Sequence, residues 1–194
     1  MTETRKRLPA GERRQLILDA AQQAFGELGY IGVTLDTIAA AANVTKPIVY
    51  RHFESKDALY LAVLERHREE LADFVEDVPA DAPLEQIVET ILRGWFAYAE
   101  VNGGRWRMLF RDSGGSPEIR DSRRRMYDDA RDVLAGFLAA HPAFDIADED
   151  LQAHAEVIRG GLSSLVLFGQ EHPEAGREQL VRAGTRMVTG LTSG

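Results

Sequence analysis

The 194-residue sequence contains no cysteine, which excludes disulfide bonds, thiolate metal sites and a cysteine nucleophile. The absence fits a reducing cytoplasm, where we expect the protein to act. No apolar run approaches the roughly 20 residues that a membrane helix needs, and the longest candidate, residues 160–169, is too short. The first residues are polar and charged, so we expect no secretory signal and no membrane segment.

Signatures of several enzyme classes are also missing from the sequence. It has no glycine-rich phosphate loop and no nucleophile elbow. Two-metal helical bundles need Glu-x-x-His pairs on facing helices, and we find none. Asp150 and His154 lie four residues apart, a spacing that suits either a metal-ligand pair or a surface ion pair. A helical-bundle enzyme or metal-binding protein is therefore the alternative function to be weighed, although we expect no enzyme, no cofactor and no metal.

Charge is unevenly distributed along the chain. The net charge is -8, but the first 56 residues carry +2 and the remainder carries −10. The basic residues near the start are Arg5, Lys6, Arg7, Arg13 and Arg14. An acidic body with a mildly basic head indicates that only one end of the molecule approaches phosphate. A solvated basic tail is the simpler explanation for the first three of these residues.

Strand-like alternation is scarce, and turn signals separate long segments of helical period, which predicts an all-α fold of about nine helices. The expected helices cover residues 10–28, 35–42, 46–53, 56–75, 84–101, 106–111, 117–141, 148–170 and 177–191. Residues 77–83 contain two prolines and are expected to form a linker. Apolar stripes are expected at Ile17, Ala20, Ala21, Ala24, Phe25 and Leu28 in the first helix, and at Ile119, Met126, Ala130, Val133, Leu134, Phe137 and Leu138 in the seventh.

The segment from Thr34 to Lys56 has the signals of two short helices joined by a tight turn. Gly29 supplies a left-handed stop for the preceding helix, and Tyr30 can pack back on its last turn. Thr34, Thr45 and Ser55 are suitable N-caps. Asn43 tolerates the left-handed backbone that the turn demands.

The outward face of the helix after Thr45 suits DNA. Pro47 falls in the first turn, where a missing N–H costs nothing, while Val49 and Phe53 are expected to face inward. The residues left toward solvent are Lys46, Pro47, Ile48, Tyr50, Arg51 and His52. This mixture of cations, hydrogen-bonding rings and apolar groups suits phosphates, base edges and thymine methyl groups.

Residues 14–60 resemble the DNA-binding domain of the TetR family of transcriptional regulators. The matching residues are Ile17, Ala20, Ala21, Phe25, Gly29, Tyr30, Thr34, Ile38, Ala39, Ala42, Val44, Pro47, Tyr50, His52, Phe53, Lys56, Leu59 and Tyr60. The match is ungapped and covers about a quarter of the chain. Asn43 stands where many relatives have glycine, and it permits the same backbone geometry.

The resemblance implies roles for individual residues. Thr34 would contact phosphate at the start of the second helix. The residues nearest the base edges would be Thr45, Lys46, Pro47 and Ile48. Those holding the phosphate backbone would be Tyr50, His52 and Lys56, while Arg51 would serve either purpose. Capping explains the threonines equally well, and a surface histidine is usually just solvated.

Beyond the head, residues 57–194 are expected to form a helical ligand-binding and dimerisation domain, with residues 1–56 forming the DNA-binding domain. This domain could hold a pocket for an unknown, partly apolar small molecule. The residues that could line the pocket are Trp95, Tyr98, Trp106, Phe110, Met126, Tyr127 and Arg159. Plain core packing is the alternative for the aromatic members.

The last two helices have the small and apolar residues of an oligomer surface. The expected interface residues are Gly161, Leu162, Leu165, Phe168, Val181, Gly184 and Val188. An intrachain core is the alternative, and the family resemblance favours a homodimer. Two heads would then contact successive major grooves about 34–36 Å apart.

We therefore predict a homodimeric repressor that a small-molecule ligand releases from a palindromic double-stranded DNA operator. A purely protein-binding helical adaptor is a further alternative.

Overall fold

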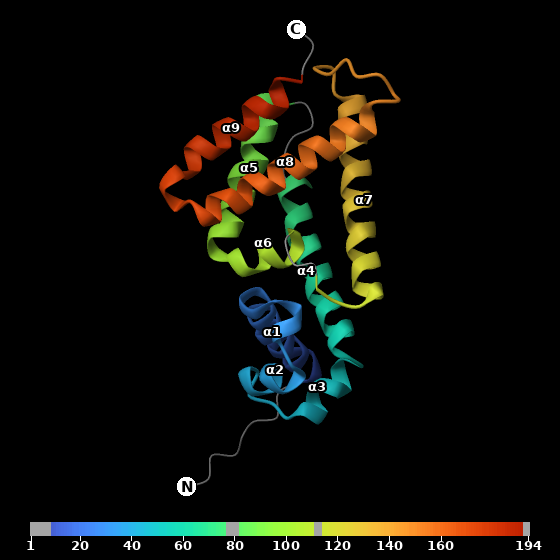
Figure 1. Cartoon of the computed structure of the whole chain (residues 1–194), viewed down its shortest axis with the longest axis vertical. Helices are drawn as coiled ribbons and strands as arrows, with labels where there is room; N and C mark the ends of the chain where they lie inside the picture. Colours follow the sequence, from blue (N-terminus) through green and yellow to red (C-terminus); the bar gives the residue numbers. More distant parts are fainter. Residues whose placement is uncertain (1–8, 77–81, 111–113, 192–194) are drawn as a thin grey trace.

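A computed structural model describes residues 9–76, 82–110 and 114–191, and all the regular secondary structure within them is helical (Figure 1). The helices are α1 (Ala10–Gly32), α2 (Leu35–Ala41), α3 (Lys46–His52), α4 (Lys56–Glu76), α5 (Leu84–Val101), α6 (Gly103–Phe110), α7 (Pro117–Ala140), α8 (Leu151–Glu171), the short 3-10 helix η1 (Pro173–Ala175) and α9 (Arg177–Thr189). The described part thus has nine α-helices, which confirms the predicted all-α fold.

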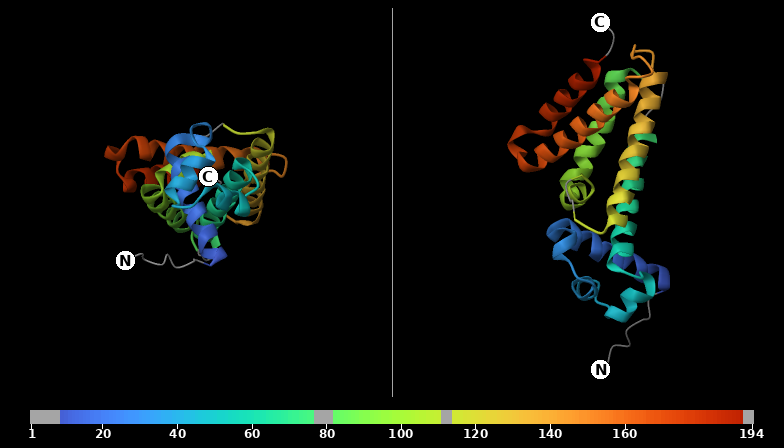
Figure 2. Two further views of the ribbon diagram at one scale, coloured as in Figure 1. Left: turned by 90° about the horizontal axis from the view of Figure 1, so that it is seen from below. Right: turned by 45° about the vertical axis from the view of Figure 1, so that its right-hand side comes forward.

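The helices form a small head and a larger body joined by α4. Helices α1, α2 and α3 make the head at one end of the molecule, and α4 runs from the head along the body (Figures 1 and 2). Helix α7 lies beside α4 and α8, while α8 and α9 pack together with α5 on the other side. Helix α4 is therefore the element that would transmit movement between the two parts.

The head has its own apolar core, built from one face of each of its helices. Ile17 and Phe25 of α1, Ile38 of α2 and Val49 of α3 are at most 1% exposed. Burial at steps of three and four residues is what drives a short amphipathic helix to pack. Leu28 has the period of this face but is 55% exposed, so its place in the apolar period does not bury it.

The core of the head continues into the body. Leu59 and Tyr60 of α4 belong to the same buried cluster, and so do Leu109 of α6 and Ile119 of α7. This continuity extends the core of the head past residue 56, the boundary predicted between the two domains. The head is thus docked on α6 and α7 as well as linked through α4.

Helices α1 and α6 meet backbone to backbone. A Cβ atom on Gly104 would lie 2.8 Å from the Cα atom of Gly26. Real Cβ atoms essentially never come within 3.0 Å of a heavy atom of another residue in this way. Helix α5 ends at Val101 as predicted, but α6 begins at Gly103, three residues before the predicted start at 106, so Gly103 and Gly104 form its first turn. The absence of side chains here permits the close crossing of the two helices.

Two other predictions from periodicity were wrong in detail. Val133 of α7 is 70% exposed and Ala130 is also exposed, because α7 is covered only where it packs on α4 and α8. Helix α8 begins at Leu151, after a turn over residues 148–150. The expected linker at 77–83 lies partly outside the described residues.

Candidate nucleic-acid interface

The turn between α2 and α3 has the predicted geometry. The Thr34 hydroxyl caps α2 by accepting a hydrogen bond from the Thr37 amide at 3.1 Å. Asn43 has φ 52°, the left-handed conformation expected of it. The Val44 amide donates to the carbonyl of Ala39 at 2.9 Å, so the turn closes on the end of α2. The orientation of α3 is therefore set by local backbone bonding.

Helix α3 begins at the predicted residue, Lys46, but the predicted side-chain cap at its start is absent. Pro47 lies in the first turn, and the Ile48 amide donates to the carbonyl of Thr45 at 2.8 Å. The Thr45 side chain makes no capping hydrogen bond, so its predicted role as a side-chain cap was wrong. Because α3 is held by its backbone and by buried Val49, the Thr45 hydroxyl is left for another partner.

The face of α3 opposite Val49 is open to solvent. Lys46, Pro47, Tyr50 and Arg51 are exposed, with Tyr50 at 49%. Ile48 is half-buried against the head core, so only part of its side chain is accessible. A row of exposed cations and an exposed phenol on one helix is a surface that can contact phosphates and base edges.

Two lysines at the edges of this face are held by neighbouring side chains. Lys46 Nζ lies 2.8 Å from Asp36 Oδ2 on α2, and this hydrogen bond raises the pKa of Lys46. Both side chains are largely exposed, so solvent and salt weaken the pair and a phosphate can replace the carboxylate. The Lys56 ammonium lies 4.1 Å from the centre of the Tyr30 ring. Ser55 caps α4 through the Ala58 amide at 3.0 Å, which fixes the start of that helix.

His52 is less suited to phosphate than the sequence indicated. Burial, followed by the positive charges of Arg51, Arg13 and Arg14, lowers its pKa. Its Nε2 atom is buried without a hydrogen-bond partner, so that atom cannot reach DNA in this conformation. Arg13 and Arg14 of α1 thus lie close enough to His52 of α3 for their charges to act on it, a proximity that sequence reasoning had not placed. The Arg14 guanidinium also lies 5.0 Å from the Phe53 ring centre.

One polar junction joins the head, α4 and the start of α7. A hydrogen bond from Ser116, followed by one from Tyr30, lowers the pKa of Asp57. Ser116 is the N-cap of α7, where it accepts a hydrogen bond from the Ile119 amide at 3.4 Å. Burial and the bond to Asp57 raise the pKa of Tyr30 to about 12. The first turn of α4 is thereby attached to α1 on one side and to α7 on the other.

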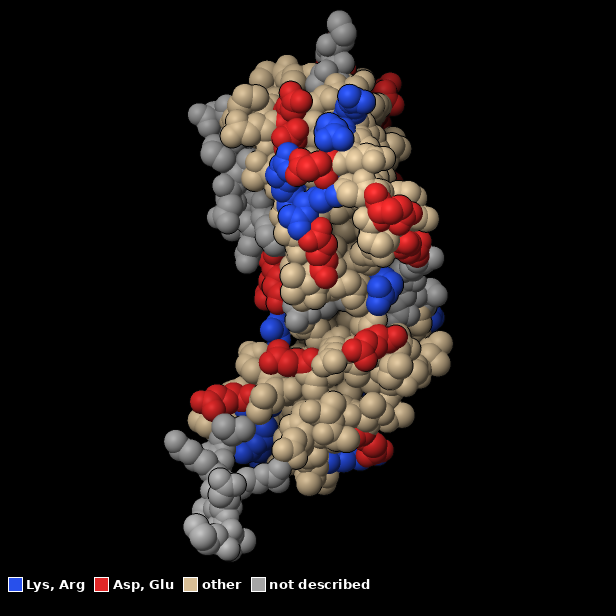
Figure 3. All heavy atoms as spheres, turned by 90° about the vertical axis from the view of Figure 1, so that its left-hand side faces the viewer, with Lys and Arg blue, Asp and Glu red and all other residues tan. Residues whose placement is uncertain are grey.

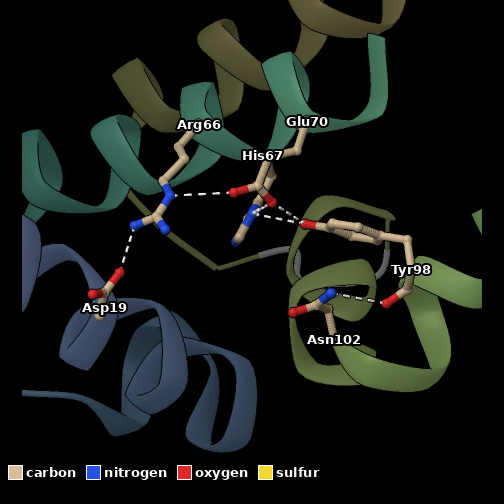
Figure 4. Close-up of polar contacts among 6 residues, drawn as sticks. All are labelled: Asp19, Arg66, His67, Glu70, Tyr98 and Asn102. Carbon is tan, nitrogen blue, oxygen red and sulfur yellow. Dashed lines mark hydrogen bonds and ion pairs between the residues drawn. The ribbon is translucent and has the colours of Figure 1, made fainter. Parts of the chain in front are cut away.

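A second polar network joins α1, α4 and α5 (Figure 4). Arg66 of α4 donates to Asp19 of α1 at 2.6 Å and to Glu70 at 3.2 Å. The Tyr98 hydroxyl of α5 donates to Glu70 Oε2 at 2.8 Å and lies 3.0 Å from His67 Nδ1. Tyr98 was expected near a ligand, and the structure places it in this bridge between α4 and the body.

The remaining aromatic candidates form one row across the body. The ring centres of Trp95 and Trp106 are 5.7 Å apart, and those of Trp106 and Phe110 are 4.7 Å apart. Phe110 stacks on Tyr127 at 6.2 Å, and the Arg159 guanidinium lies 4.7 Å from the Tyr127 ring centre. These residues from four helices pack on one another, which is the arrangement expected if they are ordinary core residues. Met126 lies apart from them, in a cleft between α4 and α7.

The residues expected at a dimer interface divide into two groups. Leu162, Val181, Gly184 and Val188 are buried within this one chain, where they pack in the body core. Phe168 is 45% exposed, while Gly161 and Leu165 are half-buried. The first group therefore supports α8 and α9 from inside, and the second reaches their outer surface. Figure 3 shows the side of the molecule that carries α9, where charged side chains lie among broad uncharged areas.

Two family models match most of the chain. The model described as bacterial regulatory proteins of the tetR family covers residues 17–63. The model described as a tetracyclin repressor-like C-terminal domain covers residues 83–191. The chain belongs to the TetR family. This TetR protein is therefore a DNA-binding transcription regulator and not an enzyme.

Relatives of this TetR protein include both a transcriptional activator and a negative transcriptional regulator. It is similar to the transcriptional activator FasR of Mycolicibacterium smegmatis, with 32% identity over 164 residues, covering 82% of this chain and 71% of that protein. It is also similar to IcaR of Staphylococcus aureus, a negative regulator of a biofilm operon, with 48% identity over 44 residues, covering 23% of this chain and 24% of that protein.

Solved structures of other regulators share the fold. The fatty acid degradation regulator FadR from Bacillus halodurans superposes with a TM-score of 0.78 at 18% identity, covering 95% of this chain and 97% of that one. A tetR-family regulator from Streptomyces coelicolor gives 0.73 at 23% identity, covering 94% and 84%.

Two further observations concern the alternatives raised by the sequence. Among the described helices, none combines the length and apolar character needed to cross a membrane. His154 Nδ1 lies 2.9 Å from the backbone oxygen of Asp150, and in the part of the chain that the structure describes no three His, Cys, Asp or Glu residues are grouped so that they could hold a metal ion.

Proposed function

We propose that this TetR protein is a homodimeric repressor that leaves a palindromic operator when a small-molecule ligand binds its body. The observation that carries the proposal is the exposed outer face of α3, presented by a tight turn and held through α4 to a separate helical body. A head of this kind binds DNA, and its rigid attachment lets the body set its position.

In the proposed complex α3 lies in the major groove. Lys46, Pro47 and Ile48 at its N-terminal end face the base edges, together with the Thr45 hydroxyl. Tyr50, Arg51 and Lys56 bind phosphates, with Thr34 at the start of α2 and Nδ1 of His52 as further contacts. Arg13 and Arg14 add positive charge at the edge of the same surface.

A second copy is proposed to pack against α8 and α9. Val157 is 64% exposed and Phe168 is 45% exposed on α8. Covering these apolar side chains with the same helices of a second copy would remove apolar area from water, whereas Gly161 between them is already covered by Met187 of α9. Two heads held at about 34–36 Å would occupy successive major grooves.

Ligand response is proposed to act through α4. Helix α4 is bonded to the head by Arg66 and Asp57 and to the body by Glu70, so a shift of α4 in the body moves the head. A ligand that binds better to the arrangement with the wrong head spacing shifts the population and lowers operator affinity. The side chains in the row of aromatic residues from Trp95 to Tyr127 would move apart to make room for a partly apolar ligand.

The test is binding to the DNA that flanks the gene. Purified protein is incubated with labelled flanking fragments at moderate salt, and protected positions are mapped by footprinting. We expect protection of a near-palindrome by a dimer, and loss of protection when Tyr50 and Lys56 are both replaced by alanine. A confirmed dimer with no specific complex on any flanking fragment would rule the proposal out.

Activation is the second candidate, since the relative that matches 82% of the chain, FasR, is named an activator. The same head and dimer would serve either role, because the sign depends on where the operator lies relative to the promoter. A reporter driven by the footprinted promoter, with and without the gene, distinguishes them. Higher expression in the deletion supports repression, whereas lower expression supports activation.

A further inference from the structure

Arg123 of α7 is a buried cation that lacks an acidic partner. Arg123 is only 8% exposed. Among the described residues, no carboxylate lies within ion-pair distance of its guanidinium. One guanidinium nitrogen donates to the Tyr60 hydroxyl at 2.8 Å, while its Nε is buried without a hydrogen-bond partner. Arginine keeps its charge in proteins, so burial without a counter-charge is costly unless an anion supplies it.

This arginine lines a cleft of about 280 Å³ between α4 and α7. The cleft is lined by Leu61, Leu64, Glu65, Arg68, Ser122, Arg123, Arg125, Met126 and Asp129. Glu65 is occupied by Arg68, whose Nε lies 3.0 Å from Glu65 Oε2, and this bond lowers the pKa of Glu65. Three arginines against two carboxylates leave the lining net positive, with the buried guanidinium at its inner side.

We propose that the α4–α7 cleft binds a small organic oxyanion, a carboxylate or phosphoryl group held by Arg123. A planar guanidinium binds such groups through paired hydrogen bonds, and the Nε atom, which is buried without a partner in this conformation, becomes one of the two donors when the side chain turns toward the anion. Leu61, Leu64 and Met126 accept the short apolar part of the same molecule. The volume lies just below the roughly 300–1,000 Å³ usual for ligand pockets, which favours a small anion over a long lipid.

The position of the cleft gives the anion a means of control. On α4, the cleft residues Leu61, Leu64 and Arg68 lie on roughly the opposite face of the helix from Arg66, His67 and Glu70, given about 100° of rotation per residue. The latter three make the network to α1 and α5 shown in Figure 4. An anion that draws α7 toward α4 would therefore act on the helix from the side opposite its attachments to the head and α5. This regulatory role rests on the proposed ligand-responsive function, whereas the binding site itself does not.

The experiment uses the whole 194-residue protein labelled with 15N-arginine. Sodium acetate, sodium butyrate and inorganic phosphate are titrated separately, with sodium chloride at matched ionic strength as the reference. We expect a saturable shift of the Arg123 Nε–H resonance and a rise in thermal midpoint. The carboxylate and phosphate arms show which oxyanion the site prefers, and tighter binding of butyrate than of acetate supports contact with the apolar side chains.

Three variants separate binding from general effects. Arg123→Gln should weaken anion binding at least tenfold, and Arg123→Lys, which keeps the charge but loses the paired donors, should weaken it less. Arg124→Gln removes the same charge from the adjacent exposed position and should bind as the unaltered protein does. Equal binding by Arg123→Gln and the unaltered protein would overturn the proposal. So would a lower thermal midpoint of Arg123→Gln with no saturable effect of any anion, since Arg123 would then only hold Tyr60.

Operator affinity is measured in parallel so that the two proposals fail separately. Absence of anion binding by a protein that still binds its operator overturns the anion site and leaves the regulator intact. Anion binding with unchanged operator affinity supports the site and overturns its role in release.

Discussion

At the scale of single residues, Tyr30 lies where the head meets α4. Its ring packs between Phe25 and Tyr60, with ring centres 6.3 and 5.1 Å away, and Lys56 covers it. Its hydroxyl donates to Asp57. A residue that looks from the sequence like a helix-end packing group is therefore also part of the polar junction between α1, α4 and α7.

The raised pKa of Tyr30 predicts a loss of stability in alkali. Because its pKa is about 12 in the fold and about 10 when unfolded, the folded protein favours the neutral phenol. Its contribution to stability is therefore complete below pH 10 and is lost as pH rises through about 12. Urea unfolding at pH 9 and pH 11 should show a smaller loss for Tyr30→Phe than for the unaltered protein. Equal losses would contradict the assignment.

Arg51 gives a test of the proposed phosphate contacts. It is exposed and lies on the outer face of α3, so Arg51→Ala should leave the thermal midpoint unchanged. Operator affinity should fall about tenfold, and the dependence of affinity on salt should weaken by about one released ion. Fluorescence anisotropy at several salt concentrations measures both. Arg124→Ala on α7 is the matched control, and an equal loss in that variant would indicate only a general charge effect.

Local chemistry made part of this site predictable. Thr34, Asn43 and Ser55 form the expected caps and turn because each acts on backbone groups within a few residues of its own position. The ion pair of Lys46 with Asp36 and the cation–π contact of Lys56 with the Tyr30 ring join separate helices, and so does the effect of the Arg13 charge on His52. No spacing rule in one sequence encodes such contacts, because they depend on the angles at which the helices pack.

At the scale of helices, the crossing of α1 and α6 depends on two glycines. Gly104→Ala would place a methyl group 2.8 Å from the Gly26 Cα, and backbone atoms cannot rotate away. We expect the free energy of unfolding to fall by about 1–3 kcal/mol, the usual cost of overpacking. Chemical denaturation measures this change.

Gly136 of α7 provides the matched control for that substitution. It lies inside a helix, and a Cβ there would meet nothing within 4 Å. Gly136→Ala should therefore stabilise the protein by roughly 0.5–1 kcal/mol through helix propensity. A result in which Gly104→Ala is equally stabilising would show that the crossing can relax.

The extent of the helices was more predictable than their buried faces. The bounds of α5 agree with the prediction because its apolar period and its end at Asn102 are local. In α7 the period placed Val133 inside, whereas the structure buries Arg123. Periodicity gives the apolar face of a helix but not which of its turns a neighbour covers, and a buried arginine leaves no apolar signal at all.

At the scale of the whole molecule, the proposed dimer can be tested on its outer surface. Phe168→Glu would place a charge in the proposed interface, and we expect a monomer at micromolar concentration by light scattering after gel filtration. Operator affinity should fall by about two to four orders of magnitude, because two linked heads bind far more tightly than one. Leu162 and Val181 are unsuitable for this test, since both are buried in the single chain.

Val133→Glu is the corresponding control on α7. It makes the same kind of change at a residue that is 70% exposed and outside the proposed interface. That variant should remain dimeric and bind the operator normally. Monomers from both variants would mean that added charge, and not the α8–α9 face, determines assembly.

The glycine crossing also bears on how heads and bodies of such regulators can be exchanged. A chimera that joined this head to a foreign body would keep the covalent link through α4 but would gain a new α6. If the residue facing Gly26 carried any side chain, the two backbones could not approach as they do here. The transplanted head would then tilt away from the body and respond to ligand poorly, even with every DNA-contacting residue unchanged. The fit between head and body is thus decided at a crossing that lies outside both the proposed DNA surface and the proposed ligand sites.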